Sequence, residues 1–219
     1  MNILFYDTET TGLPDWFSPS EAAQQPHIVQ LAAAIVDSET RRIEASVNLI
    51  VRPDGWTIPD PVGTLNARLF QITTEQAAKT GIPEADALQI FLAMWRVCEL
   101  RVAHNERFDA RIVRIATKRY CGMEAQEAWK AGYQFCTMVA SAALCGIPKA
   151  SGRGGWKFPK LSEAYTHFTG EEFVDAHNAW EDLTAAQAVY WGILDAQSKI
   201  LKEDLSTQDM YFSHRVCPF

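Results

Sequence analysis

The sequence predicts an α/β fold, with a mixed β-sheet flanked by helices. Three segments in the first half have the length and apolar pattern of strands, whereas several later segments carry apolar residues at helical spacing. With 219 residues the chain can bury one full hydrophobic core. The expected organisation is therefore one domain followed by a short tail.

Strands are expected at residues 2–8, 28–36 and 43–51, with shorter ones at 101–103 and 134–138. The first contains Ile3-Leu4-Phe5-Tyr6, a continuous apolar run typical of a strand buried on both faces. The turn signal Asp37-Ser38-Glu39-Thr40 separates the second strand from the third. This spacing predicts an antiparallel meander beside the first strand.

Helical periodicity predicts three helices. The first follows Pro83, the second begins near Phe108, and the third extends from Ala179 to about Leu194. The apolar residues of the first are Leu88, Phe91, Met94 and Trp95; those of the second are Phe108, Ile112, Ile115 and Tyr120; those of the third are Leu183, Ala186, Val189 and Tyr190.

Two carboxylates close the first expected strand. Asp7 and Glu9 point to the same face, because side chains alternate along a strand. Held together at the end of a core strand, they repel each other and lose hydration, which is costly unless a cation lies between them. Alone, such a pair would by default be read as solvated strand-end carboxylates.

Two later segments add further candidate site residues to this pair. In His104-Asn105-Glu106-Arg107-Phe108-Asp109, Asp109 lies in the first turn of a helix, near the positive end of the helix dipole. In His177-Asn178-Ala179-Trp180-Glu181-Asp182, Asp182 falls early in a later helix and His177 precedes that helix. Alone, Asp109 would be an ordinary helix-start acid and His177 a cap or core histidine. Jointly the segments indicate a site of hard oxygen ligands without thiolates, which favours magnesium or manganese over zinc.

These three segments, in this order, resemble the DEDDh branch of the DnaQ-like 3′-to-5′ exonuclease superfamily. The superfamily includes the proofreading subunit of bacterial replicative polymerase, ribonuclease T, oligoribonuclease and the TREX enzymes. Asp7 and Glu9 match its first motif, Asp109 its second, and His177 with Asp182 its third. The resemblance implies a ribonuclease H-like mixed five-stranded sheet, a DEDDh exonuclease domain at residues 1–195, and a C-terminal extension or tail at 196–219.

The resemblance also implies a role for each site residue. Asp7, Glu9, Asp109 and Asp182 would hold two Mg²⁺ ions, for which Mn²⁺ substitutes, and His177 would be the general base that activates water. Substrate contacts are implied for Thr10, Gly12, Leu13, Asn105 and Phe108. Leu13 matches the position whose apolar side chain wedges against the terminal base. For His104 we favour a structural role over a chemical one.

The implied function is release of nucleoside 5′-monophosphates from single-stranded DNA 3′ ends. An exoribonuclease acting on RNA 3′ ends or short oligoribonucleotides stays open, because one contact to the 2′-hydroxyl can decide the choice. A non-catalytic nucleic-acid-binding module is a third alternative, and the intact motifs argue against it. Family members occur as monomers, dimers and polymerase subunits, so a homodimer or a polymerase-associated partner is compatible with the sequence.

The charge is unevenly distributed. A net charge of −7 at pH 7 argues against a long duplex-binding face, although an enzyme that trims ends needs to grip only a few nucleotides. Basic residues are concentrated around the second motif, at Arg101, Arg107, Arg111, Arg114, Lys118 and Arg119. This group is either a solvated helix face or a surface that steers the strand.

Two loops are candidates for a functional role. The connection from Pro14 to Pro26 is long, and such connections are often lids or binding loops. Its Trp16 and Phe17 either stack on unpaired bases or pack beneath the loop as core cover, and we favour the second. The loop Ser151-Gly152-Arg153-Gly154-Gly155-Trp156-Lys157 combines glycines with charge but lacks a P-loop pattern.

Cysteine usage points to a reducing compartment. Five cysteines, Cys98, Cys121, Cys136, Cys145 and Cys217, are odd in number and lack Cys-x-x-Cys spacing. This pattern predicts reduced thiols in a cytoplasmic protein. No membrane span or signal peptide is expected, because the opening apolar run is only a few residues long.

Overall fold

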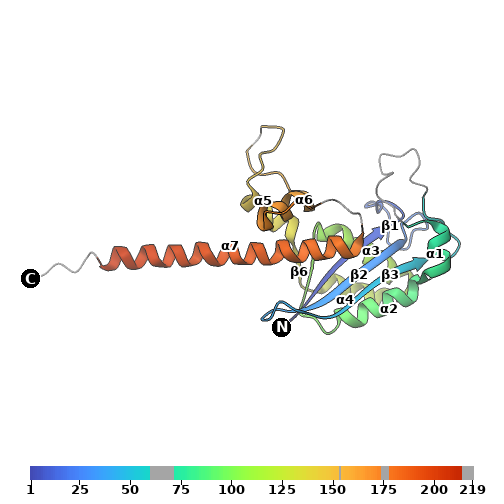
Figure 1. Cartoon of the computed structure of the whole chain (residues 1–219). Helices are drawn as coiled ribbons and strands as arrows, with labels where there is room; N and C mark the ends of the chain where they lie inside the picture. Colours follow the sequence, from blue (N-terminus) through green and yellow to red (C-terminus); the bar gives the residue numbers. More distant parts are fainter. Residues whose placement is uncertain (60–71, 153, 174–177, 214–219) are drawn as a thin grey trace, which may run out of the picture.

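The computed structural model of the protein describes residues 1–59, 72–152, 154–173 and 178–213, with side chains described as far as Lys202. In these residues six strands form one mixed sheet in the order β4-β3-β2-β1-β5-β6 (Figure 1). They are β1 (Asn2–Thr10), β2 (Ile28–Asp37), β3 (Ile43–Arg52), β4 (Ile82–Pro83), β5 (Leu100–Ala103) and β6 (Gln134–Cys136). β1, β2 and β3 form the antiparallel meander, whereas β5 runs parallel to β1 and β6 parallel to β5.

The five expected strands are all present, and β4 adds a two-residue edge paired with β3. β6 is shorter than expected, because Thr137 already begins a helix. The seven helices described are α1 (Thr74–Thr80), α2 (Glu84–Trp95), α3 (Glu106–Tyr120), α4 (Met123–Ala131), α5 (Thr137–Cys145), α6 (Leu161–Thr169) and α7 (Ala179–Ser213).

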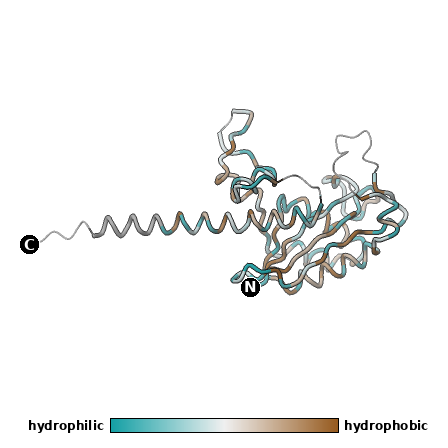
Figure 2. The backbone as a smooth tube through the Cα atoms, viewed as in Figure 1, coloured by the Kyte–Doolittle hydropathy of each residue, from teal (hydrophilic) through white to brown (hydrophobic). Residues whose placement is uncertain are grey.

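Alternate side chains of β1 face two different helical layers. Leu4 and Tyr6 belong to a core shared with α2, α3 and α4, where the Tyr6 ring centroid lies 5.6 Å from that of Trp129. Phe5 belongs to a second core against α7, with its ring centroid 5.3 Å from that of Tyr190. Both faces are covered, in keeping with the continuous apolar run from Ile3 to Tyr6, and the hydropathy colouring shows the central strands as largely hydrophobic (Figure 2).

Helix α7 is longer than expected. It continues to Ser213 rather than ending near Leu194, because residues 193–213 contain no glycine or proline to stop a helix. Its N-terminal part packs on the sheet, and its C-terminal part projects away from the domain (Figure 1). Ile200 and Leu201 on the projecting part are 49% and 64% exposed. The expected boundary at residue 195 therefore falls inside one continuous helix.

In the described part of the chain, no helix is long and apolar enough to cross a membrane. The thiols of Cys98, Cys121, Cys136 and Cys145 are free, as expected. Cys217 lies outside the described residues.

Candidate functional site

The end of β1 brings Asp7 and Glu9 to one face of the sheet. Asp7 lies opposite Ala32 of β2 and Glu9 opposite Gln30, and both acids share the alternation that points Phe5 toward α7. Carboxylate oxygens of Asp7, Glu9 and Asp182 all lie within 4.8 Å of one another. Three of the four carboxylates expected in the site therefore meet closely enough to share a metal ion.

Asp182 reaches this cluster because the start of α7 is fixed against β2. The Asn178 side-chain oxygen accepts a hydrogen bond from the Trp180 backbone N–H at 3.0 Å, as a helix N-cap does. Gln30 Oε1 accepts one from the Ala179 N–H at 3.2 Å, and Gln30 Nε2 donates to Asn48 Oδ1 at 2.8 Å. The sequence reasoning missed Gln30, although it is the only polar residue between Ile28 and Val36 and is 4% exposed.

Asp109 enters the site from the first turn of α3. Its Oδ1 accepts hydrogen bonds from the Thr8 backbone N–H at 3.0 Å and from Thr8 Oγ1 at 2.7 Å, and the residue is 3% exposed. It stands beside the three clustered carboxylates rather than among them, yet its negative charge raises the pKa of Asp7. Thr8 thus links the first two motifs, a role that only its place between Asp7 and Glu9 could have suggested.

The four carboxylates destabilise one another's charged forms. Burial first, and then the charges of Asp109, Asp182 and Glu9, raise the pKa of Asp7 well above its usual range. Burial and Asp182 raise the pKa of Glu9 to about 7, and burial raises that of Asp109 to about 8 despite its bonds to Thr8. Such a cluster of hard oxygen donors fits divalent cations such as Mg²⁺ or Mn²⁺, whose charge would offset this repulsion.

Two of the expected substrate-contacting residues, Thr10 and Phe108, directly adjoin Glu9 and Asp109 in the chain. Thr10 Oγ1 donates to the Gly12 carbonyl at 2.8 Å, which closes the turn that presents Leu13, and Leu13 is 84% exposed. Asn105 takes a left-handed conformation with φ 63° immediately before α3. Asn105 and Phe108 line an open hollow of about 490 Å³ together with Trp16, Phe17 and Arg107.

The expectation that Trp16 and Phe17 pack beneath their loop is wrong, because they are 44% and 101% exposed. Polar contacts hold the loop instead. The Asp15 carboxylate accepts from the Phe17 and Ser18 backbone N–H groups, and Gln25 Nε2 donates to three backbone carbonyls of the loop. With the backbone anchored by this network, Phe17 is left to solvent, and Trp16 is partly covered by the Arg107 guanidinium.

Of the two motif histidines, the structure describes His104 but not His177. His104 braces neighbouring segments, as expected, since its Nδ1 lies 2.9 Å from Thr137 Oγ1 and its Nε2 lies 3.1 Å from the Pro159 carbonyl. Burial lowers the pKa of His104 to about 4, so it is neutral at physiological pH. His177, the expected general base, lies outside the described residues.

The exonuclease family RNase_T matches residues 4–190 of the chain. Among solved structures, E. coli Exonuclease I in complex with a dA16 oligonucleotide is 22% identical, with a TM-score of 0.65, and its complex with a dT13 oligonucleotide is 24% identical, with a TM-score of 0.67. Each match covers 94% of this chain and 43% of that chain. At these identities the likeness concerns the fold, and the chain spans less than half the length of these structures. No curated protein sequence matches the chain significantly.

Proposed function

The chain belongs to the RNase_T exonuclease family of the DnaQ-like superfamily, and on that premise we propose that it is a Mg²⁺-dependent 3′-to-5′ exonuclease. Its products would be nucleoside 5′-monophosphates released from single-stranded DNA ends. The observation that carries the proposal is the convergence of Asp7, Glu9 and Asp182 within 4.8 Å, with Asp109 beside them.

The donor set fits the proposed cofactor. Carboxylate oxygens are the ligands preferred by Mg²⁺ and Mn²⁺, and the cluster found among the described residues consists of carboxylates alone. Asp7, Glu9, Asp109 and Asp182 would together hold two ions. When bound, such ions acidify water and stabilise negative charge on the phosphodiester.

The chain's own residues would then position the metal-binding carboxylates and deprotonate the attacking water. Thr8 fixes the Asp109 carboxylate through two hydrogen bonds, and Gln30 fixes the helix start that delivers Asp182. His177 would take the proton of the attacking water as general base, which typically contributes about 10²- to 10⁴-fold to the rate. The exposed Leu13 would pack against the terminal base, while Asn105 and Phe108 would contact the terminal nucleotide.

An unpaired strand is the substrate form that the site surroundings favour. Leu13, Trp16 and Phe17 present exposed apolar and aromatic surface in the segment that follows Glu9, and such surfaces stack on unpaired bases. The similar Exonuclease I structures were determined with single-stranded oligonucleotides. A homodimer or a polymerase-associated partner stays a prediction.

The test is a degradation ladder on matched 5′-labelled oligonucleotides of DNA and RNA, single-stranded and blunt duplex, with Mg²⁺ or with EDTA. We expect a Mg²⁺-dependent ladder that shortens from the 3′ end, strongest on single-stranded DNA. A faster ladder on RNA would make the protein an exoribonuclease. Absence of any ladder, with nucleic-acid binding retained, would leave only the binding-module alternative.

A further inference from the structure

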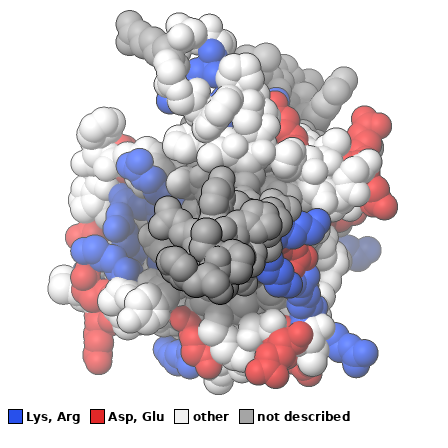
Figure 3. Space-filling view, turned by 90° about the vertical axis from the view of Figure 1, so that its left-hand side faces the viewer, with Lys and Arg blue, Asp and Glu red and all other residues white. Residues whose placement is uncertain are grey.

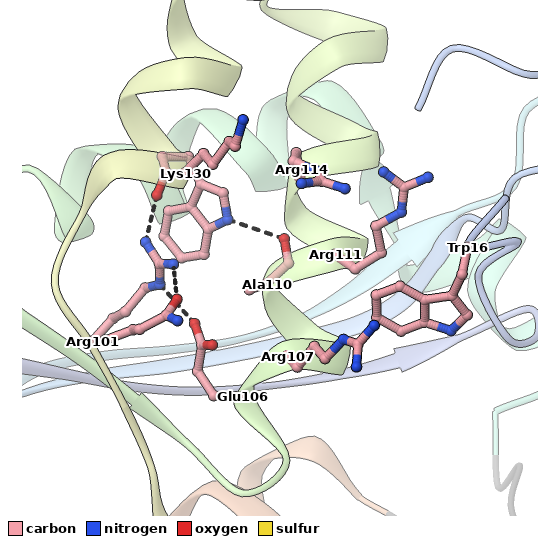
Figure 4. A pocket seen from close by; sticks show the side chains of 10 residues that line it. Trp16, Arg101, Glu106, Arg107, Ala110, Arg111, Arg114 and Lys130 are labelled. Carbon is pink, nitrogen blue, oxygen red and sulfur yellow. Dashed lines mark hydrogen bonds and ion pairs between the residues drawn. The ribbon is translucent and has the colours of Figure 1, made fainter. Parts of the chain in front are cut away.

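A second cavity lies on the side of α3 that faces away from the carboxylates. It has a volume of about 360 Å³ and is lined by Trp16, by three arginines of α3, and by residues at the end of α4 and the start of β6. Figure 4 shows Arg107, Arg111 and Arg114 following one another along α3, with Lys130 across from them. At 100° per residue these arginines lie about 140–160° around the helix from Asp109.

The cavity carries an excess of positive charge. Its one acidic side chain, Glu106, is already used: it accepts from Arg101 Nε at 2.8 Å and from the Tyr6 hydroxyl at 3.1 Å. Among the described residues, neither Arg107 nor Arg114 forms an ion pair. The acidic partner of Lys130 is Glu127, at 3.5 Å on the exposed surface of α4.

Arg111 is a buried cation without an anion bound to it. The residue is 6% exposed, and its guanidinium donates to Ser20 Oγ and to the backbone carbonyls of Asp15 and Ser18, all of them uncharged acceptors. Burial, followed by the like charge of Arg114, lowers the pKa of Arg111, and the charges of Asp15 and Glu21 offset this shift only in part. Two arginines that repel each other beside a cavity would be stabilised by an anion placed between them.

The cavity adjoins the open hollow lined by Phe108, the residue that precedes Asp109 in the chain. Trp16 and Arg107 line both this cavity and the hollow formed with Phe17, Asn105 and Phe108, and the Arg107 guanidinium lies 4.6 Å from the Trp16 ring centroid. A strand whose 3′ end occupies the cluster would therefore meet Trp16 and Arg107 before it reached Arg114. The face shown in Figure 3 carries groups of basic side chains alongside groups of acidic ones.

We propose that this arginine-lined cavity binds backbone phosphate of the single-stranded nucleic acid on the 5′ side of the nucleotide being removed. The proposal rests on the proposed function for the direction of the strand, but its phosphate chemistry stands on the cavity. A guanidinium group can bind two phosphate oxygens at once. Of the cations that line the cavity, Arg107 and Lys130 are exposed and Arg114 is half-buried.

Binding is tested without catalysis, in EDTA, by the fluorescence anisotropy of 5′-labelled (dT)16 with wild type, Arg114→Gln, Lys130→Gln and Lys79→Gln. Lys79 is an exposed lysine of α1 outside the cavity, and its variant controls for the loss of one charge. Each phosphate contact on a single strand contributes about 0.7 to the slope of log K against log salt concentration. Arg114→Gln should therefore lower this slope by about 0.7 and weaken binding about fivefold near 0.1 M salt.

A kinetic comparison separates the cavity from the catalytic cluster. A dinucleotide has a single phosphodiester, which the carboxylate site would occupy, so no phosphate remains for the cavity. We expect Arg114→Gln to raise the KM for (dT)16 about fivefold and to leave kcat/KM for (dT)2 unchanged. Lys130→Gln, at a solvent-exposed position on α4, gives the same test where the α3 substitution perturbs folding.

Several outcomes would overturn the proposal. One is that Arg114→Gln and Lys130→Gln bind (dT)16 as Lys79→Gln does, with the same salt slope. Another is that free thymidine 5′-monophosphate displaces labelled (dT)16 at equal phosphate concentration, which would make the cavity a mononucleotide site.

A different result would separate this proposal from the proposed function. A wild type that cleaves no oligonucleotide, but binds (dT)16 more tightly than Arg114→Gln does, would refute the exonuclease function and support the phosphate site.

Discussion

Neutralising Glu9 in the metal-free protein tests the electrostatics of the site directly. Burial and Asp182 raise the pKa of Glu9 from its ordinary 4.5 to about 7. Below pH 4.5 the group is protonated in both folded and unfolded chains, so it imposes no cost. Above pH 7 it is charged in both states and the folded state bears the full penalty. The free energy of unfolding should therefore fall as pH rises from about 4.5 to about 7.

The size of the effect follows from the same shift. One pKa unit is worth about 1.4 kcal/mol, so the charge of Glu9 costs the metal-free fold at most roughly 3.5 kcal/mol. Solvent reaches part of the side chain and screens the interaction, which reduces the expected difference to about 1–2 kcal/mol. Glu9→Gln should thus be more stable than wild type by about 1–2 kcal/mol near pH 8 and nearly equal to it near pH 5.

The assay is urea unfolding in EDTA, followed by tryptophan fluorescence at both pH values, with the exposed Glu44→Gln as the matched control. In millimolar Mg²⁺ the order should reverse, because wild type gains the free energy of ion binding and the variant loses a ligand. A Glu9→Gln variant that is less stable than wild type in EDTA near pH 8 would refute the reasoning. An equal gain from Glu44→Gln would assign the effect to net charge.

Asp7→Ala should abolish Mg²⁺-dependent cleavage but leave the metal-free protein folded, because one source of carboxylate repulsion is gone, and substantial turnover would contradict its assignment as a ligand. His177→Ala should lower kcat about 10²- to 10⁴-fold with metal binding retained and remove the acid limb of the pH–rate profile, whereas an unchanged limb would mean another base. Thr8→Val should lower kcat about 5- to 30-fold, because it releases the Asp109 carboxylate. The control Thr117→Val also loses a buried hydroxyl but should leave kcat unchanged. Equal effects of the two variants would indicate general destabilisation. Single-stranded DNA 3′ ends should be cleaved faster than blunt duplex ends, since fraying a pair costs on the order of a kcal/mol, and equal rates would show a grip that extends into the duplex.

Local sequence patterns predicted the principal strands, three of the seven described helices and the motifs. Period-two and continuous apolar segments predicted the five principal strands, and the spacing of apolar residues placed α2, α3 and the start of α7. The same alternation put Asp7 and Glu9 on one face, and the observed cluster with Asp182 confirms it. The end of α7 was misplaced because a helix without a stop signal extends beyond the part that is packed.

The basic group around the second motif shows what the sequence left undecided. Arg101 is 1% exposed and forms an ion pair with Glu106, and Arg119 Nη1 lies 3.5 Å from Glu84 Oε1. These two charges are therefore engaged in ion pairs within the protein. Arg107 and Arg114 instead line a cavity. The group is therefore not one continuous surface, and a role of its cavity-lining members in guiding the strand stays a prediction.

Only the tertiary structure decided which distant residues meet. Thr8 reaches Asp109 across 101 positions of sequence, and Gln30 reaches Ala179 across 149. Trp16 and Phe17 are exposed because a polar network anchors their loop, which aromatic composition does not reveal. The physical reason is that periodicity reports which face of an element is buried, whereas the partner on the other side of that face depends on how the layers pack.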